Sequence, residues 1–348
     1  MSVWASREFD DHEQVCFFSD ERAGLRAIVA IHSTFLGPAI GGTRFKAYQT
    51  DTLALDDALR LSRAMSYKSA LAGMPVGGGK SVIIGDPAAL KTRELLHAYG
   101  RFIDRIGVSY ATGEDVGISV QDIDTVAEVT RFVGGTSGGA GDPSVHTAIG
   151  CVHGLRAVMQ SGFGTDSFEG VRVAIQGLGA VGWRIAERLH AARASLIVAD
   201  IRPEVVDKAM RAFGANAQPS EMIHRSDVDI YAPCALGGVI TESSAREIRA
   251  KAVAGAANNQ LATPRAGAIL AERNILFAPD FVLNAGGVIS GLEAASNMPG
   301  RKQVKFAPLE ERLEAIHDRL GEIFRRSRAE RRPPEVTAEQ MARELIGR

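Results

Sequence analysis

The segment VRVAIQGLGAVGWRIAERLHAARASLIVADI, residues 171–201, constrains the fold more than any other part of the chain. An apolar strand leads into the spacing Gly-x-Gly-x-x-Gly at 177–182, and an amphipathic helix follows to about residue 192. A second apolar strand ends at Asp200. A lone glycine motif is weak evidence because glycine turns are common. A strand, glycine loop, helix, strand and terminal acid in this order predict a dinucleotide-binding βαβ unit.

Each part of this unit has a predicted role. Gly177 and Gly179 let the backbone approach the pyrophosphate at the helix N-terminus, and Gly182 lets the helix pack closely on the strand. Asp200 can accept hydrogen bonds from the adenine-ribose hydroxyls and would repel a 2′-phosphate, so NAD is favoured over NADP, although Arg202 weakens this preference. The cofactor residues predicted within the unit are Gly177, Gly179, Ala180, Val181, Gly182, Asp200 and Ile201.

Three further apolar runs end in small or amide residues. They are DVDIYAPCALG, AVAGAANNQL and ILFAPDFVLNAGGVI. The carboxyl ends of strands in an open α/β sheet face the ligand crevice. Turn formation could explain Asn258, Asn259 or Asn284 alone, but their repetition at strand ends favours a shared site. Ala235 follows the first of these runs and is a predicted cofactor contact.

The stretch AGMPVGGGKSVIIGDP, residues 72–87, superficially matches a phosphate-binding loop. That loop requires a glycine where Met74 stands, a strand before it and a helix after it. Here residues 52–72 have helical periodicity, with Asp51 at the cap position, and the run after Lys80 is typical of a strand. A nucleotide triphosphatase is therefore disfavoured. A glycine turn carrying a solvated lysine remains the alternative to a functional Lys80.

The chain of 348 residues predicts two domains of the α/β class. We expect an N-terminal αβ domain over 1–145, for substrate binding and oligomerisation, and a Rossmann NAD-binding domain over 146–305. The glycine-rich segment 134–144 is typical of a hinge or a ligand-approaching loop. Amphipathic helices over about 306–348 are expected to return to the first domain.

Composition narrows the class of protein. A formal net charge of −1 argues against a general nucleic-acid surface, and no apolar run approaches the length of a membrane span. The three cysteines are isolated and lack Cys/His ligand spacing, so neither a disulfide framework nor a metal site is predicted. There is no N-terminal apolar leader. We therefore expect a cytoplasmic enzyme or binding protein without nucleic-acid or membrane partners.

Several motifs together resemble the amino acid dehydrogenases of the glutamate/leucine/phenylalanine/valine family, closest to the leucine/phenylalanine type. GPAIGGTRF, SYKSALAGMPVGGGKSVI, GEDVG, GLGAVG, GAANNQL and FAPDFVLNAGGVI follow the family's order over most of 37–290. The resemblance implies NAD-dependent, reversible oxidative deamination of an L-amino acid to its 2-oxo acid, ammonium and NADH. It also implies a homo-oligomer, a dimer or a higher even-numbered assembly.

The resemblance assigns roles to individual residues. Lys68 pairs with the substrate α-carboxylate, Lys80 is the general base on a water molecule, and Asp115 handles protons at the amino group. Desolvation and the nearby Lys68 charge would lower the pKa of Lys80, as a base requires. A surface salt bridge is the alternative for either lysine alone, but both flank one glycine run.

The remaining implied residues line the substrate and the nicotinamide. Thr147 lies beside the nicotinamide amide, Asn258 near cofactor and substrate, and Asn284 near the substrate. The other members of the implied substrate site are Ile40, Gly41, Gly42, Met65, Gly113, Asn259, Val288 and Gly291.

Ile40 and Gly291 predict the kind of side chain that the substrate carries. Ile40 stands where glutamate-specific members have a lysine, and Gly291 lies across the pocket, so neither can pair with a γ-carboxylate. Gly113 and Gly291 replace the alanine and valine of leucine-type enzymes, which predicts a roomier pocket suited to phenylalanine or a larger aromatic. A leucine or valine dehydrogenase of the same mechanism is the alternative.

Two other functions are weaker alternatives. A hydroxy-acid dehydrogenase usually pairs a histidine with an acid, and His146 is the nearest candidate. A non-catalytic NAD-sensing protein would keep the fold without the chemistry, but Lys68, Lys80 and Asp115 are all present.

Overall fold

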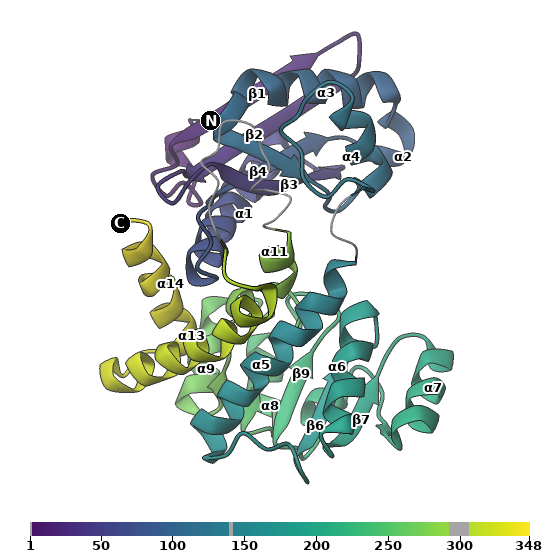
Figure 1. Ribbon diagram of the computed structural model, residues 1–348, viewed down its shortest axis with the longest axis vertical. Coiled ribbons are helices and arrows are strands. Elements are labelled where there is room, and N and C mark those ends of the chain that lie inside the picture. The colour runs from purple at the N-terminus through teal and green to yellow at the C-terminus, as the bar shows by residue number, and fades with distance from the viewer. Residues whose placement is uncertain (1, 139–141, 292–305) are drawn as a thin grey trace. The chain divides into compact units, whose positions relative to one another are not determined.

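The computed structural model describes residues 2–138, 142–291 and 306–348 (Figure 1). The described residues form two compact units. The first unit comprises 2–138, Gly291 and 342–348, and the second comprises 142–290 and 306–341. Positions 139–141 of the predicted hinge segment 134–144 lie outside the described residues.

The first unit is built on a mixed five-stranded sheet with the order β1-β2-β4-β3-β5. Its strands are β1 (Gln14–Asp20), β2 (Leu25–Ser33), β3 (Ala39–Lys46), β4 (Gly77–Ile84) and β5 (Tyr110–Gly113). The central strand β4 is antiparallel to β2 and parallel to β3. The sequences of β1 and β2 are QVCFFSD and LRAIVAIHS.

Helices cover both faces of this sheet. The helices of the first unit are α1 (Asp51–Leu71), α2 (Pro87–Leu90), α3 (Arg93–Ile106) and α4 (Val120–Ala127). Short 3-10 turns lie at Val3–Ala5 and Gly107–Ser109. Side chains alternate along β2: Ala27, Val29 and Ile31 pack with α3 and α4, whereas Ile28 and Ala30 pack with α1.

The glycine run before Lys80 belongs to strand β4 and is not a turn. A Cβ at Gly78 would lie 2.0 Å from the Ser66 backbone nitrogen, and one at Gly77 would lie 1.9 Å from the Ser33 carbonyl oxygen. Neither distance is compatible with a side chain, so these glycines let α1 and the end of β2 pack directly against the β4 backbone.

Capping residues explain where the first-unit helices begin. Thr50, and not the predicted Asp51, caps α1 by accepting a hydrogen bond from the Leu53 backbone. Ser119 forms a capping box with Asp122 at the start of α4.

The second unit has a six-stranded parallel sheet with the order β11-β10-β9-β6-β7-β8. Its strands are β6 (Arg172–Gln176), β7 (Ser195–Ala199), β8 (Asn216–Ala217), β9 (Ile230–Pro233), β10 (Ala252–Val253) and β11 (Leu276–Phe277). This is the strand order of the doubly wound dinucleotide-binding fold. All its strands are parallel, and the order in which the chain adds strands to the sheet reverses between β6 and β9. The predicted α/β fold class is confirmed.

The second unit contains most of the helices after residue 142. They are α5 (Pro143–Phe163), α6 (Ala180–Ala191), α7 (Pro203–Phe213), α8 (Glu242–Glu247), α9 (Pro264–Glu272), α10 (Asp280–Leu283), α11 (Gly286–Ser290) and α13 (Leu309–Glu330). A 3-10 turn lies at Ile223–Arg225, and α14 (Pro334–Leu345) follows α13. No helix in the described ranges is long and apolar enough to cross a membrane.

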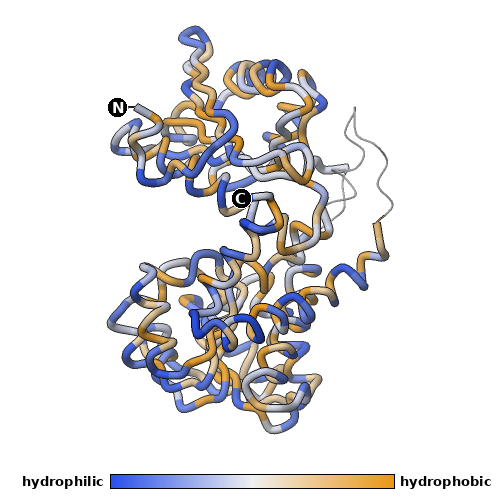
Figure 2. Tube along the Cα trace, turned by 90° about the vertical axis from the view of Figure 1, so that its left-hand side faces the viewer, coloured by the Kyte–Doolittle hydropathy of each residue, from blue (hydrophilic) through white to orange (hydrophobic). Residues whose placement is uncertain are grey.

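The prediction that the helices after about residue 306 return to the first domain is wrong for α13. This helix packs on α5 within the second unit (Figure 1). Hydrophobic and hydrophilic residues alternate along this helix (Figure 2), and its apolar stripe is buried. A Cβ at Gly150 would lie 2.6 Å from Ile316 Cδ1, and one at Gly154 would lie 2.9 Å from Leu320 Cδ1. These two glycines of α5 thus make room for α13. Of residues 306–348, only Ala342–Arg348 belong to the first unit.

The last residues of the chain are tied to the first unit by two arginines. Arg343 donates hydrogen bonds of 2.7 and 2.8 Å to the two carboxylate oxygens of Asp10. Arg348 Nη1 donates to His32 Nε2 at 2.8 Å, so this nitrogen carries no proton and the ring is neutral. The His32 side chain is fully buried. Burial, reinforced by the Arg348 charge, lowers the pKa of His32 to about 3.

This burial predicts a loss of stability in acid. In the unfolded chain His32 takes up a proton below a pKa of about 6.5, whereas in the folded chain it stays neutral until about 3. Stability is therefore fully present above that unfolded value and falls as the pH drops toward 3. In urea unfolding followed by circular dichroism, His32→Gln should reduce the slope of unfolding free energy against pH, near pH 5, by about 1.4 kcal/mol per pH unit. Equal slopes in both proteins would contradict this account.

Candidate active site

The buried ion pair between Lys80 and Asp115 is the centre of the site in the first unit. Lys80 lies on β4 and is 7% exposed. Its Nζ atom is 2.6 Å from Asp115 Oδ2. Alternation along β4 directs Lys80 to the same face as Gly78 and Val82, which pack against α1. The alternative of a solvated lysine on a glycine turn is therefore wrong.

Burial and charge act in opposite directions on this pair. Burial lowers the pKa of Lys80 more strongly than the Asp115 charge raises it, so the net shift is downward. Burial alone would raise the pKa of Asp115, but the charges of Lys80 and then Arg44 bring it below its ordinary value. A lysine with a lowered pKa releases its proton closer to neutral pH, which suits a general base.

Two glycines of β3 bring the backbone of the site together. A Cβ at Gly41 would lie 1.7 Å from the Gly79 carbonyl oxygen, and one at Gly42 would lie 2.3 Å from the Glu114 carbonyl oxygen and 3.1 Å from Asp115 Cβ. Only glycine at position 42 lets the loop carrying Asp115 approach β3 so closely. Most of the segment GPAIGGTRF thus forms strand β3.

Other predicted substrate residues also belong to the first unit. Lys68 and Met65 are partly buried on α1, which packs on β4. Ile40 pairs with Gly78 in the parallel register of β3 and β4, and is partly buried. Gly113 pairs with Gly42 at the end of β5. Gly291 belongs to the same unit and is exposed.

Sequence reasoning missed Arg44. Its Nε atom lies 3.3 Å from Asp115 Oδ2, and its Nη1 atom lies 2.9 Å from Asp57 Oδ2. The signal was available, because Gly42 and Arg44 lie two residues apart and share a face of a strand.

The three glycines of the dinucleotide loop in the second unit have different roles. Gly177 has φ +101°, and a Cβ there would lie 2.6 Å from Ala235 Cβ, so β6 and β9 meet at this loop. A Cβ at Gly182 would lie 2.0 Å from the Gly177 carbonyl oxygen. A Cβ at Gly179 would meet nothing within 4 Å, and this residue caps α6 without any side-chain hydrogen bond. Backbone N–H groups at this helix start are therefore available to a phosphate, which fits the pyrophosphate of NAD.

Asp200 follows β7 beside this loop. Its Oδ2 accepts a hydrogen bond of 2.7 Å from the Leu178 backbone, and its Oδ1 accepts one of 2.9 Å from Arg202 Nε. The Arg202 hydrogen bond is the main cause that lowers the pKa of Asp200 to about 2. The Arg202 backbone N–H at 3.0 Å and Arg202 Nη2 at 3.3 Å donate to the same carboxylate, so ribose hydroxyls would take the place of Arg202 contacts. The next residue, Ile201, is 89% exposed.

A second group of predicted residues is brought together around α11. Asn284 Nδ2 donates to Asn258 Oδ1 at 2.8 Å and to the Ala256 carbonyl at 3.2 Å. A Cβ at Gly287 would lie 2.7 Å from Thr147 Oγ1, so α11, which carries Val288, packs on the first turn of α5. These contacts place the predicted amide and hydroxyl groups in one region of the second unit.

Asn259 differs from the other predicted amides. It is exposed, as Asn258 is, but it has φ +51°, and its backbone carbonyl accepts a hydrogen bond of 2.7 Å from the Gly238 N–H. The backbone of Asn259 thus joins the loop after β10 to the loop after β9. As for metals, no cluster of three or more His, Cys, Asp or Glu side chains able to hold an ion occurs in the part of the chain that the structure describes.

Comparison with known proteins agrees with this geometry. Residues 12–132 match the family described as Glu/Leu/Phe/Val dehydrogenase, dimerisation domain. Residues 200–342 match the family described as Glutamate/Leucine/Phenylalanine/Valine dehydrogenase. The two matches together cover most of the chain.

Individual relatives span nearly the full length of the chain. It is 44% identical to the leucine dehydrogenase of Geobacillus stearothermophilus over 349 residues, 99% of this chain and 94% of that protein. It is 44% identical to the valine dehydrogenase of Streptomyces virginiae over 341 residues, 96% of this chain and 94% of that protein. The crystal structure of L-tryptophan dehydrogenase from Nostoc punctiforme superposes with a TM-score of 0.85 at 38% identity, covering 97% and 96% of the two chains.

Members of this family use NAD, which the open glycine loop and Asp200 fit. The chain therefore belongs to the glutamate/leucine/phenylalanine/valine dehydrogenase family and is an NAD-dependent amino acid dehydrogenase acting on the CH–NH₂ group.

Proposed function

We propose that this enzyme reversibly deaminates an L-amino acid with an apolar side chain, using Lys80 as the base and Asp115 as the proton carrier. The observation that carries the proposal is the buried contact of 2.6 Å between Lys80 Nζ and Asp115 Oδ2. A lysine this deeply buried, with a lowered pKa and a single carboxylate at its ammonium group, has the properties expected of a general base.

The proposed residues divide the chemistry between them. Bound NAD supplies the hydride acceptor. Lys68 pairs with the α-carboxylate and fixes the amino acid while Cα loses hydride and an iminium forms. Neutral Lys80 then takes a proton from the water that attacks this carbon. Asp115 then moves the hydroxyl proton of the carbinolamine to the amine nitrogen, and the carbon–nitrogen bond breaks as the carbonyl forms. The released ammonia takes up the proton held by Lys80 and leaves as ammonium with the 2-oxo acid.

Substitution of the pair tests this mechanism. Lys80→Ala should lower kcat/KM at least ~100-fold and Asp115→Asn by a similar factor, because general acid–base steps contribute on the order of 10² to 10⁴. Absorbance of NADH formed from L-amino acids is the measurement. The control is Lys91→Ala, which also removes a lysine–carboxylate pair, with Asp122 at 2.7 Å, in the same unit. Full activity in Lys80→Ala would contradict the proposed mechanism.

For the substrate side chain we propose a large apolar group, with phenylalanine or tryptophan among the best substrates. Ile40 offers no charge to a γ-carboxylate, and Gly291 adds no side chain at the opposite wall inferred from the family resemblance. The similarity to a tryptophan dehydrogenase over nearly the whole chain supports this choice.

A leucine or valine substrate is the second candidate. The leucine and valine dehydrogenases named above are each 44% identical to this chain. In addition, a Cβ at Gly113 would lie 3.1 Å from the Gly134 carbonyl oxygen. The methyl group absent at Gly113 would therefore point toward backbone, which reduces the room gained there.

A panel of L-amino acids decides between these substrates. We expect kcat/KM for phenylalanine or tryptophan to exceed that for valine by about tenfold or more, the scale expected when a pocket accommodates extra apolar groups. A panel that ranks valine first would reject the aromatic preference and favour the second candidate. The variant Gly113→Ala reports separately whether this position contributes any room.

We also propose an even-numbered homo-oligomer that assembles through the first unit. Residues 12–132 match a dimerisation domain, and β1 is an edge strand of the described sheet with Phe17 59% exposed. An edge strand offers unpaired backbone groups to a second copy. Light scattering should give a dimer or a higher even-numbered assembly, and a monomer at micromolar concentration would contradict this.

A further inference from the structure

Asp115 has two cationic partners, and only one of them has a proposed role in the reaction. Lys80 Nζ lies 2.6 Å and Arg44 Nε 3.3 Å from the same oxygen, Oδ2. If Lys80 releases its proton during the reaction, its charge no longer holds the carboxylate. Arg44 keeps its charge at any working pH, so it is the constant anchor of Asp115.

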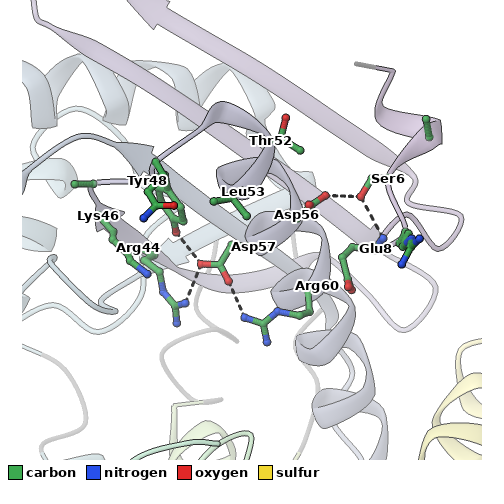
Figure 3. A pocket seen from close by; sticks show the side chains of 14 residues that line it. Ser6, Glu8, Arg44, Lys46, Tyr48, Thr52, Leu53, Asp56, Asp57 and Arg60 are labelled. Atoms are coloured by element: carbon green, nitrogen blue, oxygen red, sulfur yellow. Dashed lines mark hydrogen bonds and ion pairs between the residues drawn. The ribbon is translucent and has the colours of Figure 1, made fainter. Parts of the chain in front are cut away.

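Arg44 is itself held from its other side. Its Nη1 atom donates a hydrogen bond of 2.9 Å to Asp57 Oδ2 on α1. Asp57 also accepts hydrogen bonds of 2.7 Å from the Tyr48 hydroxyl and 2.7 Å from Arg60 Nη2. Figure 3 shows these three donors converging on the Asp57 carboxylate. The Arg44 guanidinium thus connects the carboxylate of α1 to the carboxylate of the proposed site.

The chain of contacts is partly withdrawn from solvent. The side chains of Arg44, Asp57 and Asp115 are 20%, 12% and 24% exposed, so their charges are screened less than those of a surface pair. Arg44, Tyr48, Asp57 and Arg60 also line a pocket of about 780 Å³. Tyr48 packs in addition against the core cluster beneath α1, whereas Arg44 and Asp57 belong to none of the hydrophobic core clusters of the described residues.

The backbone positions the same carboxylate from a different direction. Asp115 Cβ lies 3.1 Å from the position that a Cβ at residue 42 would occupy. The close approach that Gly42 permits thus fixes the position of Asp115 Cβ. The free rotation that remains is that of the carboxylate, and Arg44 Nε restrains it. Misplacement of a reacting group by about 1 Å can cost on the order of 10²-fold in rate.

We propose that Arg44 is a positioning residue for the reaction: it orients Asp115 toward Lys80, and Asp57, with Tyr48 and Arg60, holds Arg44 in place. The inference rests on the roles proposed above for Lys80 and Asp115. Arg44 itself contacts neither water nor substrate in this role, and it acts through the Asp115 carboxylate.

The charged groups around the pair determine the expected pH behaviour. The largest charge effects on Lys80 come from Asp115 in the loop after β5, Arg44 on β3 and Asp57 on α1, and Lys68 is a further charge on α1, which packs on β4. Among them Arg44 lowers the pKa of Lys80 and Asp57 raises it. Loss of the Arg44 charge should therefore move the acid limb of kcat for deamination to higher pH. Loss of the Asp57 charge should move it to lower pH.

Two variants of Arg44 and one of Asp57 test the proposal by steady-state kinetics. Arg44→Gln should lower kcat about 10- to 100-fold with little change in KM for the amino acid or in NAD binding. Arg44→Lys should recover part of kcat, because it restores the charge but cannot bridge both carboxylates. Asp57→Asn should lower kcat less than Arg44→Gln, with the acid limb displaced in the opposite direction.

The matched control is Arg26→Gln. It removes an arginine–aspartate pair, with Asp51, from the exposed surface of the same unit, where both side chains are more than half exposed. This variant should keep the wild-type kcat and pH profile. A parallel loss in Arg26→Gln would overturn the specific role of Arg44.

The outcomes separate this inference from the proposed function. Wild-type kcat and an unmoved acid limb in Arg44→Gln, together with an inactive Lys80→Ala, would overturn the role of Arg44 and leave the proposed function standing. An active Lys80→Ala would overturn the proposed function itself. If Arg44→Gln fails to fold by circular dichroism, Arg44→Lys and Asp57→Asn decide, and wild-type kcat in both overturns the inference.

Discussion

The direct packing of helix α1 on the backbone of β4 is the contact on which the rest of the first unit depends. No side chain fits at Gly78, where a Cβ would lie 2.0 Å from the Ser66 backbone. Because the helix lies this close, Lys80, two residues on along the same face, is covered and loses water. The same helix carries Lys68 and Asp57, so one close contact brings the proposed carboxylate-binding, basic and anchoring groups into one unit.

Burial and charge then define the properties of Lys80. Desolvation disfavours its ammonium form, while Asp115 favours it, and burial has the larger effect. The positive charge of Arg44 also lowers the pKa of Lys80, and it favours the ionised form of Asp115. The arrangement keeps a carboxylate beside a lysine without making that lysine a poor base.

Sequence reasoning predicted what depends on local order and periodicity. The strand, glycine loop, helix and terminal Asp200 of the dinucleotide unit follow from spacing alone. It left a glycine turn before Lys80 as an alternative, because glycine has low strand propensity and its function here, close backbone approach, appears only when a neighbour is placed at Gly41 or Gly78. It misplaced α13 for a similar reason: an apolar stripe does not say which surface covers it, and here the glycines of α5 decide. Arg44 was missed because its partners are far away in sequence.

The central claim is that burial outweighs the attraction of Asp115 and leaves Lys80 with a lowered pKa. Nuclear magnetic resonance titration of the protein with ¹³C-methylated lysines, with the Lys80 signal assigned from Lys80→Arg, measures this directly. The account predicts that Lys80 titrates below the ordinary lysine value of about 10.4. Titration at or above that value would show that the ion pair dominates, and would contradict the account of Lys80 as the base.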